Sequence, residues 1–324
     1  MKRQGHLNPG LPGAAAASVA IDQSTFWSDV VELSKPGIVK MVLVSTAVGF
    51  FLAAVGQTWN LGTLMMLALS CAVGTALSGA GANMLNQVFE IRRDGLMPRT
   101  AGRPLPAGRI TASAGLLLGV TVSMLGVAIL YVGAGTAAAM VSLITILSYV
   151  FIYTPLKPVT PLATLIGAVP GALPPLIGWA AASREPFGGL QDPAGWSIFL
   201  IMFVWQVPHF LAIAWKYRAQ YGAAGHRVLP VVDPSGVRTG WTVLVWSLTL
   251  IPTSLAAVEF LHGRVGWLYA IVALFCGIGF LLSGINMAIE RSDRSARRLF
   301  FASIIYLPVV LMAMVLDATL GILF

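Results

Sequence analysis

The fold is decided by the apolar run LGTLMMLALSCAVGTALSGAGA at residues 61–82, which leads without a break into the polar run NMLNQVFEIRRD at residues 83–94. The apolar run has the length of roughly 20 residues that an α-helix needs to cross the hydrocarbon core of a membrane. The polar run then brings amide, carboxylate and guanidinium groups to the end of the same segment. Residues 61–94 therefore predict a membrane-spanning helix that ends in a polar site.

The composition extends this prediction to the whole chain. Hydrophobic residues make up 57% and charged residues 10% of the 324 residues, and the mean hydropathy is +0.83; these values exclude an ordinary soluble domain. We predict an all-α polytopic membrane protein with nine transmembrane helices. Their expected ranges are 38–56, 61–82, 113–132, 136–153, 162–181, 197–215, 242–260, 266–287 and 299–322.

The distribution of basic residues predicts the orientation of the chain. With nine spans and the N-terminus on the cytoplasmic side, 18 of the 20 lysine and arginine residues fall on that side, and only Arg184 and Arg264 fall on the other. This asymmetry is what the positive-inside rule describes. Topology thus explains the net charge of +8, and we expect the bilayer, and no nucleic acid, as a partner.

The two largest polar loops expected on the cytoplasmic side, residues 83–110 and 216–240, lie four helices apart. This spacing predicts two repeated four-helix units followed by a ninth helix, around a central cavity that opens to the cytoplasmic side. Residues 1–30 are polar and rich in Gly, Ala and Pro, and we assign them to a mobile cytoplasmic tail. Residues 31–324 are assigned to one intramembrane domain.

Asn86, Glu90 and Asp94 are the candidate metal ligands and catalytic residues. Steps of four residues place their side chains on one face of a helix, about 6 Å apart along its axis. Their oxygen atoms are the hard ligands that Mg²⁺ takes while it keeps positions for water and phosphate. The alternative is a polar helix end that simply enters water, but such an end would not require three oxygen donors in register.

A basic loop follows this helix. Arg99 and Arg103 stand in the run Arg-Thr-Ala-Gly-Arg-Pro-Leu-Pro, in which the prolines limit the freedom of the backbone. Guanidinium groups suit phosphate oxygens, so these two arginines are candidates for closing over a diphosphate. Membrane topology explains their charge equally well, and it is the preferred explanation for Arg92, Arg93 and Arg109.

Later segments add further candidate binding residues on the same side. Tyr153 and Lys157 end the fourth span, where Lys157 is either a phosphate ligand or an interfacial anchor. His209 lies within the sixth span, where an ionisable side chain is costly without a role; it binds a ligand, acts as a base, or is satisfied by hydrogen bonds within the bundle. Lys216 and Arg218 end that span and could meet a diphosphate from the opposite side.

These segments, in this order, resemble the UbiA superfamily of intramembrane prenyltransferases. The superfamily's first metal motif, Asn-x3-Asp-x3-Asp, matches Asn86-x3-Glu90-x3-Asp94, with Glu in place of the first Asp. Five further runs resemble the branch of protoheme IX farnesyltransferases. They are Arg-Thr-x2-Arg-Pro-Leu at 99–105, Tyr-Thr-Pro-Leu-Lys at 153–157, Ile-Gly-Ala-x-Pro-Gly-Ala-x-Pro-Pro at 166–175, Trp-Gln-x-Pro-His-Phe at 205–210 and Leu-Pro-Val-Val at 229–232.

The resemblance implies a Mg²⁺-dependent enzyme of a bacterial inner membrane. Such an enzyme transfers the farnesyl group of farnesyl diphosphate to the vinyl group of heme b and gives heme O. The resemblance further implies that Asn86, Glu90 and Asp94 hold Mg²⁺. With heme as the acceptor, His209 is our candidate for contacting it, as iron ligand or propionate partner. A heme A synthase would be the next enzyme in the sequence of reactions.

One position departs from the family's pattern. The heme branch commonly has Asp before Tyr after the sixth span, whereas this chain has Gln220-Tyr221 and no acid between Asp192 and Asp233. A second Mg²⁺ would then be held mainly by diphosphate and water, or basic side chains on this side would replace it.

Two other functions stay open on the sequence alone. A prenyltransferase with an aromatic acceptor, such as a quinone precursor, would share the first metal motif. A transporter of an anionic or phosphorylated lipid would also have many spans. Transporters often contain inverted repeats, however, whereas the two polar loops of this chain are expected on the same side of the membrane.

Overall fold

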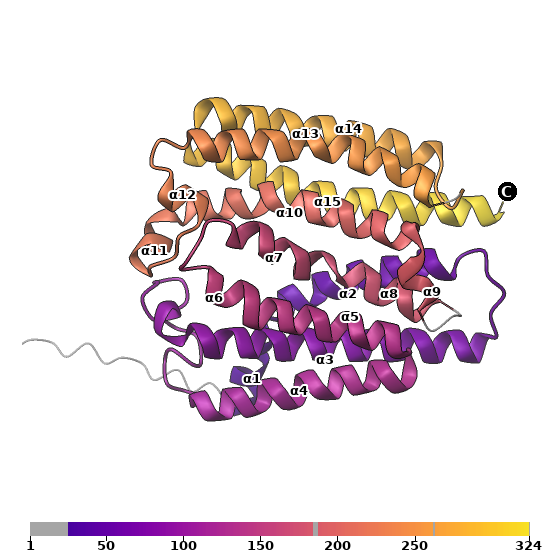
Figure 1. The fold of residues 1–324 in the computed structure, drawn as a ribbon, viewed down its shortest axis with the longest axis horizontal. Helices are drawn as coiled ribbons and strands as arrows, with labels where there is room; N and C mark the ends of the chain where they lie inside the picture. Colours follow the sequence, from indigo (N-terminus) through magenta and orange to yellow (C-terminus); the bar gives the residue numbers. More distant parts are fainter. Residues whose placement is uncertain (1–24, 184–186, 262, 324) are drawn as a thin grey trace, which may run out of the picture.

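The computed structural model describes residues 25–183, 187–261 and 263–323, in which all regular secondary structure is helical (Figure 1). The helices are α1 (Phe26–Ser34), α2 (Pro36–Ala54), α3 (Leu61–Asp94), α4 (Ala112–Gly133), α5 (Thr136–Leu147), the π-helix η1 (Ser148–Tyr153), α6 (Thr154–Leu156), α7 (Ala163–Ala172), α8 (Pro174–Ala181), α9 (Gly188–Gln191), α10 (Pro193–Lys216), α11 (Arg218–Ala223), α12 (Leu229–Val232), α13 (Val237–Phe260), α14 (Trp267–Glu290) and α15 (Asp293–Leu323).

Nine helical segments among the described residues are long and apolar enough to cross a membrane, which confirms the predicted all-α fold with nine spans. Helix α3 continues past the expected span of 61–82 to Asp94 and has 34 residues, as the run of residues 61–94 predicts. At 1.5 Å per residue this helix is about 50 Å long, and it exceeds a hydrocarbon core of roughly 30 Å. The excess length carries the polar run of residues 83–94.

Two of the spans are interrupted. The fourth span changes from α5 into the π-helix η1 before its last turn, α6. The fifth span divides at Pro174 into α7 and α8, within the stretch where Gly and Pro are frequent in the sequence. All eight residues of α8 are buried, as expected because neighbouring helices must satisfy backbone groups that a break sets free inside a membrane.

The polar loops gather at one end of the bundle. The loop after α3 lies beside α6, α11 and α12 at this end, whereas α9 and the C-terminus lie at the other (Figure 1). Arg99 Nη2 donates to Tyr221 Oη at 3.2 Å and so joins the two largest loops. We call residues 95–111, 157–162 and 217–236 the loop end. The expectation that both polar loops lie on the same side is therefore confirmed.

The expected mobile tail, residues 1–30, falls largely outside the described residues. The described chain begins at Thr25, whose side chain caps α1 by accepting from Ser28 N at 3.3 Å. Helix α1 thus includes the last residues that we assigned to the tail. It packs against α3 near the loop end (Figure 1).

Small residues allow the helices of the first half to approach closely. A Cβ atom on Gly178 of α8 would overlap the backbone of Thr46 on α2 and would lie 2.7 Å from Phe50 N. A Cβ atom on Gly126 of α4 would likewise overlap the backbone of Ser78 on α3. Glycine at these contacts serves the close backbone approach that small residues provide in membrane helices.

We expect Gly178→Ala to destabilise the protein by about 1–3 kcal/mol, because the added methyl group must push α2 and α8 apart. The matched control is Gly279→Ala on α14, where a Cβ atom would meet nothing within 4 Å and where alanine favours the helix. Thermal unfolding in detergent measures both variants. Equal midpoints for Gly178→Ala and Gly279→Ala would contradict this packing.

Candidate active site

The end of α3 buries the three predicted metal ligands. Asn86, Glu90 and Asp94 are only 1%, 6% and 3% exposed. Asn86 Nδ2 donates to Glu90 Oε2 at 2.9 Å, so side chains four residues apart meet on one helix face, as their spacing predicts. Carboxylates are almost never this buried without a partner, and Glu90 and Asp94 each have one.

Each carboxylate of α3 is paired with a cation from another segment. Lys157 Nζ donates to both oxygens of Glu90, at 2.9 and 3.0 Å. Arg103 Nη1 donates to Asp94 Oδ2 at 2.7 Å. The basic loop and the fourth span, which the sequence proposed separately as partners of a diphosphate, therefore converge on the motif of α3.

Lys35 brings a third cation to the motif. It lies between α1 and α2 with φ at 52°, and its Nζ donates to Asn86 Oδ1 at 2.8 Å. Burial lowers the pKa of Lys35 to about 7, and the positive charges of Arg103 and Lys157 act in the same direction. An anion bound beside Lys35 would relieve this repulsion, so the site is electrostatically suited to a phosphate group.

Lys157 remains protonated. Burial acts to lower its pKa, but Tyr153 and the Glu90 carboxylate outweigh burial and hold the pKa above its ordinary value. The Lys157 ammonium lies 4.6 Å from the centroid of the Tyr153 ring, a cation–π distance. The π-helix η1 presents Tyr149 and Tyr153 as a stacked pair with ring centroids 5.6 Å apart, so both rings stand next to the charged cluster.

Polar side chains of α3 also fix the C-terminus of α1. Asn83 Nδ2 donates to Ser34 O at 3.1 Å, and Gln87 Nε2 donates to Leu33 O at 2.7 Å. These bonds satisfy carbonyl groups that a helix end leaves free. Because Lys35 follows directly, they also determine where its ammonium group can reach.

Two basic residues have structural partners. Arg109 Nε donates to Asp29 Oδ1 and its Nη2 to Glu32 Oε2, both at 2.9 Å, which ties α1 to the loop after α3. Arg218 Nη1 donates to Asp293 Oδ1 at 2.6 Å. Arg218 therefore contacts α15, whereas the sequence proposed it as a partner of a diphosphate.

Arg99 and Lys216 share one aromatic partner. The guanidinium carbon of Arg99 lies 4.6 Å from the ring centroid of Tyr217 and 5.4 Å from that of Tyr221. The Lys216 ammonium lies 5.1 Å from the centroid of Tyr217. The contacts of Arg99 join the two largest loops, and the contact of Lys216 adds positive charge beside the same ring.

His209 lies deeper in the bundle, between two aromatic rings. Its ring is stacked on Trp205 at 4.7 Å and on Phe300 at 5.4 Å. Its Nδ1 lies 2.7 Å from Ser303 Oγ, and Ser303 Oγ in turn donates to Phe300 O at 2.6 Å. Since the hydroxyl proton of Ser303 is used in that way, Nδ1 of His209 is the donor and Nε2 carries the lone pair.

A central cavity of about 490 Å³ extends inward from the motif. Its volume lies within the range of small-molecule sites. The lining is mainly apolar and comes from α2, α3, α5, η1, α7, α8, α10 and α15. Asn83, one turn before Asn86, lines it, as do Tyr153 and His209. The cavity therefore offers an apolar volume next to a charged cluster.

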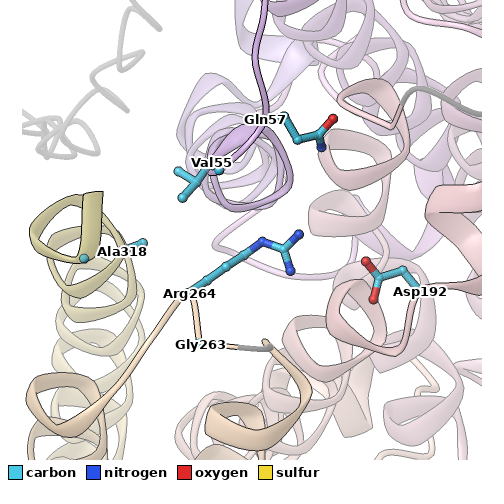
Figure 2. A pocket seen from close by; sticks show the side chains of 8 residues that line it. Val55, Gln57, Asp192, Gly263, Arg264 and Ala318 are labelled. Carbon is cyan, nitrogen blue, oxygen red and sulfur yellow. The ribbon is translucent and has the colours of Figure 1, made fainter. Parts of the chain in front are cut away.

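A second cavity, of about 560 Å³, lies away from these residues. The guanidinium group of Arg264 points between Gln57 and Asp192 in it (Figure 2). Asp192 Oδ1 also accepts from Ala194 N at 2.9 Å and caps α10. None of the candidate residues from the sequence lines this cavity, so we place the active site at the central one.

Residues 42–305, well over half of the chain, match the UbiA prenyltransferase family. The chain belongs to this family. Curated relatives cover almost its full length. A protein named protoheme IX farnesyltransferase from Solibacter usitatus is 41% identical over 293 residues, which are 89% of this chain and 98% of the relative. One of the same name from Opitutus terrae is 40% identical over 292 residues, 90% of this chain and 95% of the relative.

Solved structures of UbiA proteins have the same fold. A UbiA homologue from Archaeoglobus fulgidus bound to GPP and Mg²⁺ has a TM-score of 0.62 at 14% identity, and the match covers 89% of this chain and 99% of that one. A structure described as digeranylgeranylglyceryl phosphate synthase has a TM-score of 0.70 at 17% identity, covering 90% and 98%. At these identities the likeness establishes the fold and not the substrate.

The motif Asn86-x3-Glu90-x3-Asp94 fits a divalent cation that takes its remaining ligands from the substrate and from water. In the described part of the chain, no three His, Cys, Asp or Glu side chains form a cage for a metal ion. Asn86 and Glu90 offer hard oxygen atoms, which suit Mg²⁺ with water and phosphate as further ligands. These oxygen atoms now accept from Lys35 and Lys157. A metal ion at the same oxygen atoms would repel these cations and compete with them.

Sequence reasoning missed three residues near this cluster. No local pattern marks Lys35, because its place in a left-handed turn beside α3 depends on tertiary contacts. Thr154 accepts from Asn86 Nδ2 at 3.0 Å. His226 is 4% exposed in the loop after α11. The sequence pointed to it only as a histidine in the segment that lacks the acid expected for a second metal ion.

We expect Lys157→Gln to lower the stability of the protein by about 3 kcal/mol, because it leaves the Glu90 carboxylate buried without its partner. This is the low end of the usual range, since 18% of the Lys157 side chain is exposed. The double variant Lys157→Gln with Glu90→Gln should recover most of the loss. Thermal unfolding in detergent measures all three proteins, with the exposed Lys40→Gln as control. Additive losses in the double variant would contradict the pairing.

Proposed function

We propose that this protein transfers the farnesyl group of farnesyl diphosphate to the vinyl group of heme b and so forms heme O. The proposal rests on the names of the relatives. Proteins that are 35–41% identical and match about nine-tenths of the chain are named protoheme IX farnesyltransferases. The geometry agrees with this chemistry, because a charged cluster that suits a diphosphate adjoins an apolar cavity that suits an isoprenoid chain.

In this proposal the charged cluster holds the diphosphate. Asn86, Glu90 and Asp94 would hold Mg²⁺, as the oxygen donors of α3 allow and as the Mg²⁺-bound UbiA homologue suggests. Arg103 and Lys157, which already lie against these carboxylates, would contact the diphosphate oxygens once substrate and metal are bound. Bound Mg²⁺ would supply charge stabilisation for the leaving group.

Arg99, Lys216 and Tyr153 complete the substrate side. Arg99 lies on two tyrosines at the junction of the two loops, a position from which its guanidinium would close over the diphosphate. Lys216 shares one of those rings and adds positive charge there. Tyr153 lines the cavity beside Lys157 and would contact the allylic end of the farnesyl chain. Arg218 pairs with Asp293, and we assign it a structural role.

The reaction proceeds by breaking the C1–O bond of farnesyl diphosphate. The oxygen leaves with the electron pair, and the fixed cations Lys157 and Arg103 stabilise the charge that develops on the diphosphate. The vinyl group of heme b attacks C1 of the farnesyl cation and forms the new C–C bond. Water then adds to the resulting cation and loses a proton, which gives a hydroxyethylfarnesyl group. The apolar lining of the cavity limits the access of water to the first cation.

His209 is our candidate for the heme contact. It lines the same cavity, and its Nε2 carries the lone pair because Nδ1 donates to Ser303. A neutral imidazole in this tautomer is a common ligand for a metal ion, so we assign Nε2 to the heme iron. With Trp205 and Phe300 stacked on its ring, His209 would also hold the porphyrin near C1 of the farnesyl chain.

We place the protein in a bacterial inner membrane with its N-terminus and the loop end on the cytoplasmic side. The positive charge at the loop end supports this orientation under the positive-inside rule. Farnesyl diphosphate would then reach the charged cluster from the cytoplasm. Heme O would leave for the next enzyme, a heme A synthase.

We expect Asp94→Asn to reduce Mg²⁺-dependent farnesylation of heme b at least about 100-fold, because the site loses a charged metal ligand. The control is Asp192→Asn. Asparagine keeps the N-cap of α10, and this end of α10 lies away from the charged cluster. Incubation with heme b, farnesyl diphosphate and Mg²⁺, followed by mass spectrometry of the heme, measures the product. Full Mg²⁺-dependent turnover by Asp94→Asn would refute the metal assignment.

The same incubation separates the alternative functions. A farnesylated heme supports the proposal. Prenylation of an aromatic acceptor without any heme product would instead favour a quinone-type prenyltransferase. If the purified protein turned over neither acceptor, the transporter hypothesis would gain support.

We expect His209→Phe to lower the yield of heme O at least about tenfold while the binding of farnesyl diphosphate stays unchanged. Phenylalanine keeps an aromatic ring stacked on Trp205 and Phe300 and removes the ring nitrogens. The separate readout is the absorption spectrum of bound heme, which should lose the features of an imidazole-ligated iron. An unchanged spectrum with unchanged yield would show that His209 is a packing residue.

A further inference from the structure

The loop after α10 contains two buried polar atoms that have no partner. Gln220 Oε1 and His226 Nδ1 are both buried and make no hydrogen bond within the described part of the chain. An unsatisfied buried polar atom costs about 1–3 kcal/mol, so two within seven residues of one loop require an explanation. No acidic residue lies between Asp192 and Asp233, so the loop brings no carboxylate of its own to the site.

Backbone hydrogen bonds hold the segment of His226 beside Lys157. Arg227 N donates to Lys157 O at 2.9 Å, and His226 N donates to Tyr221 O at 2.9 Å. Lys157 is the residue whose ammonium group binds Glu90. The segment of His226 therefore runs beside the residue that supplies the cation of the central ion pair.

The charges around the imidazole ring agree with this position. Burial lowers the pKa of His226, and the strongest charge acting on its ring is the Glu90 carboxylate, followed by Lys157, Arg93 and Asp94. The ring is 4% exposed and packs edge-on against Tyr221 at 5.5 Å. Tyr221 is also the residue that accepts from Arg99, so His226 stands where the two loops meet.

The chemistry of the two unpartnered atoms points to a cation. Gln220 Oε1 can only accept, and Nδ1 of a neutral imidazole presents a lone pair when the proton is on Nε2. A phosphate oxygen cannot satisfy two acceptors, whereas a divalent ion can. An imidazole nitrogen is also a softer ligand than a carboxylate oxygen and suits transition-metal ions better than Mg²⁺.

We propose that His226, assisted by Gln220, ligates a second divalent cation at the diphosphate and supplies an uncharged donor pair opposite the carboxylates of α3. This proposal rests on the proposed function for the presence of a diphosphate. It makes this chain more tolerant of Mn²⁺ and similar ions than a site built from carboxylates alone. The first cation stays with Asn86, Glu90 and Asp94.

The test is electron spin echo spectroscopy of Mn²⁺ bound to the full chain in detergent with farnesyl thiodiphosphate, an analogue that is cleaved slowly. We expect modulation from a directly coordinated nitrogen in the unchanged protein, its loss in His226→Ile, and its retention in His209→Phe. Modulation that persists in His226→Ile, or that is absent from the unchanged protein, would overturn the proposal.

A binding measurement adds a second readout. In His226→Ile the affinity for Mn²⁺ should fall at least about tenfold, as is usual when support for a metal ion is lost, while the affinity for Mg²⁺ changes less. Introducing Gln220→Asp into His226→Ile should raise the affinity for Mg²⁺ above that of His226→Ile, because a carboxylate oxygen replaces the amide oxygen at this position. Equal losses for both ions in His226→Ile, with no gain in Mg²⁺ affinity from Gln220→Asp, would contradict a ligand role. If His226→Ile unfolds, His226→Asn replaces it, since it removes the ring but keeps a polar side chain.

The outcomes also separate this inference from the proposed function. Nitrogen modulation without any farnesylated heme would support the cation site and contradict the heme acceptor. Farnesylated heme without nitrogen modulation would support the acceptor and overturn the role of His226.

Discussion

A carboxylate buried at the end of a membrane-spanning helix must be paired with a cation, and this constraint organises the structure. Glu90 is 6% exposed, and its partner Lys157 comes from the fourth span. Asp94 is paired with Arg103 from the basic loop, and Lys35 reaches the same face from between α1 and α2. Separate parts of the chain must therefore meet at the end of α3, because an unpaired charge there would cost several kcal/mol.

This pairing also connects the polar site to the apolar cavity. The π-helix η1 precedes Lys157 directly and turns Tyr149 and Tyr153 toward both the ion pair and the cavity. Asn83 lines the cavity one turn before Asn86 and at the same time holds the end of α1. A ligand with a charged head and an apolar chain would therefore be in contact with one continuous set of side chains.

The sequence predicted the features that depend on local pattern. The nine spans follow from runs of apolar residues, and the shared face of Asn86, Glu90 and Asp94 follows from their spacing on one helix. It could not predict Lys35, because a lysine before a proline reaches α3 only through the packing of α1. Nor could the sequence predict the contact between Arg218 and Asp293, because the two residues are 75 positions apart and no local pattern joins them. Arg218 was therefore proposed as a diphosphate ligand.

In the proposed function, the charged face of α3 binds the metal and the diphosphate. Anomalous X-ray scattering from crystals grown with Mn²⁺ and farnesyl thiodiphosphate locates the metal. We expect an anomalous peak within about 2.5 Å of the oxygen atoms of Asn86 and Glu90, with Lys35 moved away from Asn86. A peak at another place, such as the cavity of Arg264 and Asp192, with the contact between Lys35 and Asn86 intact, would contradict it.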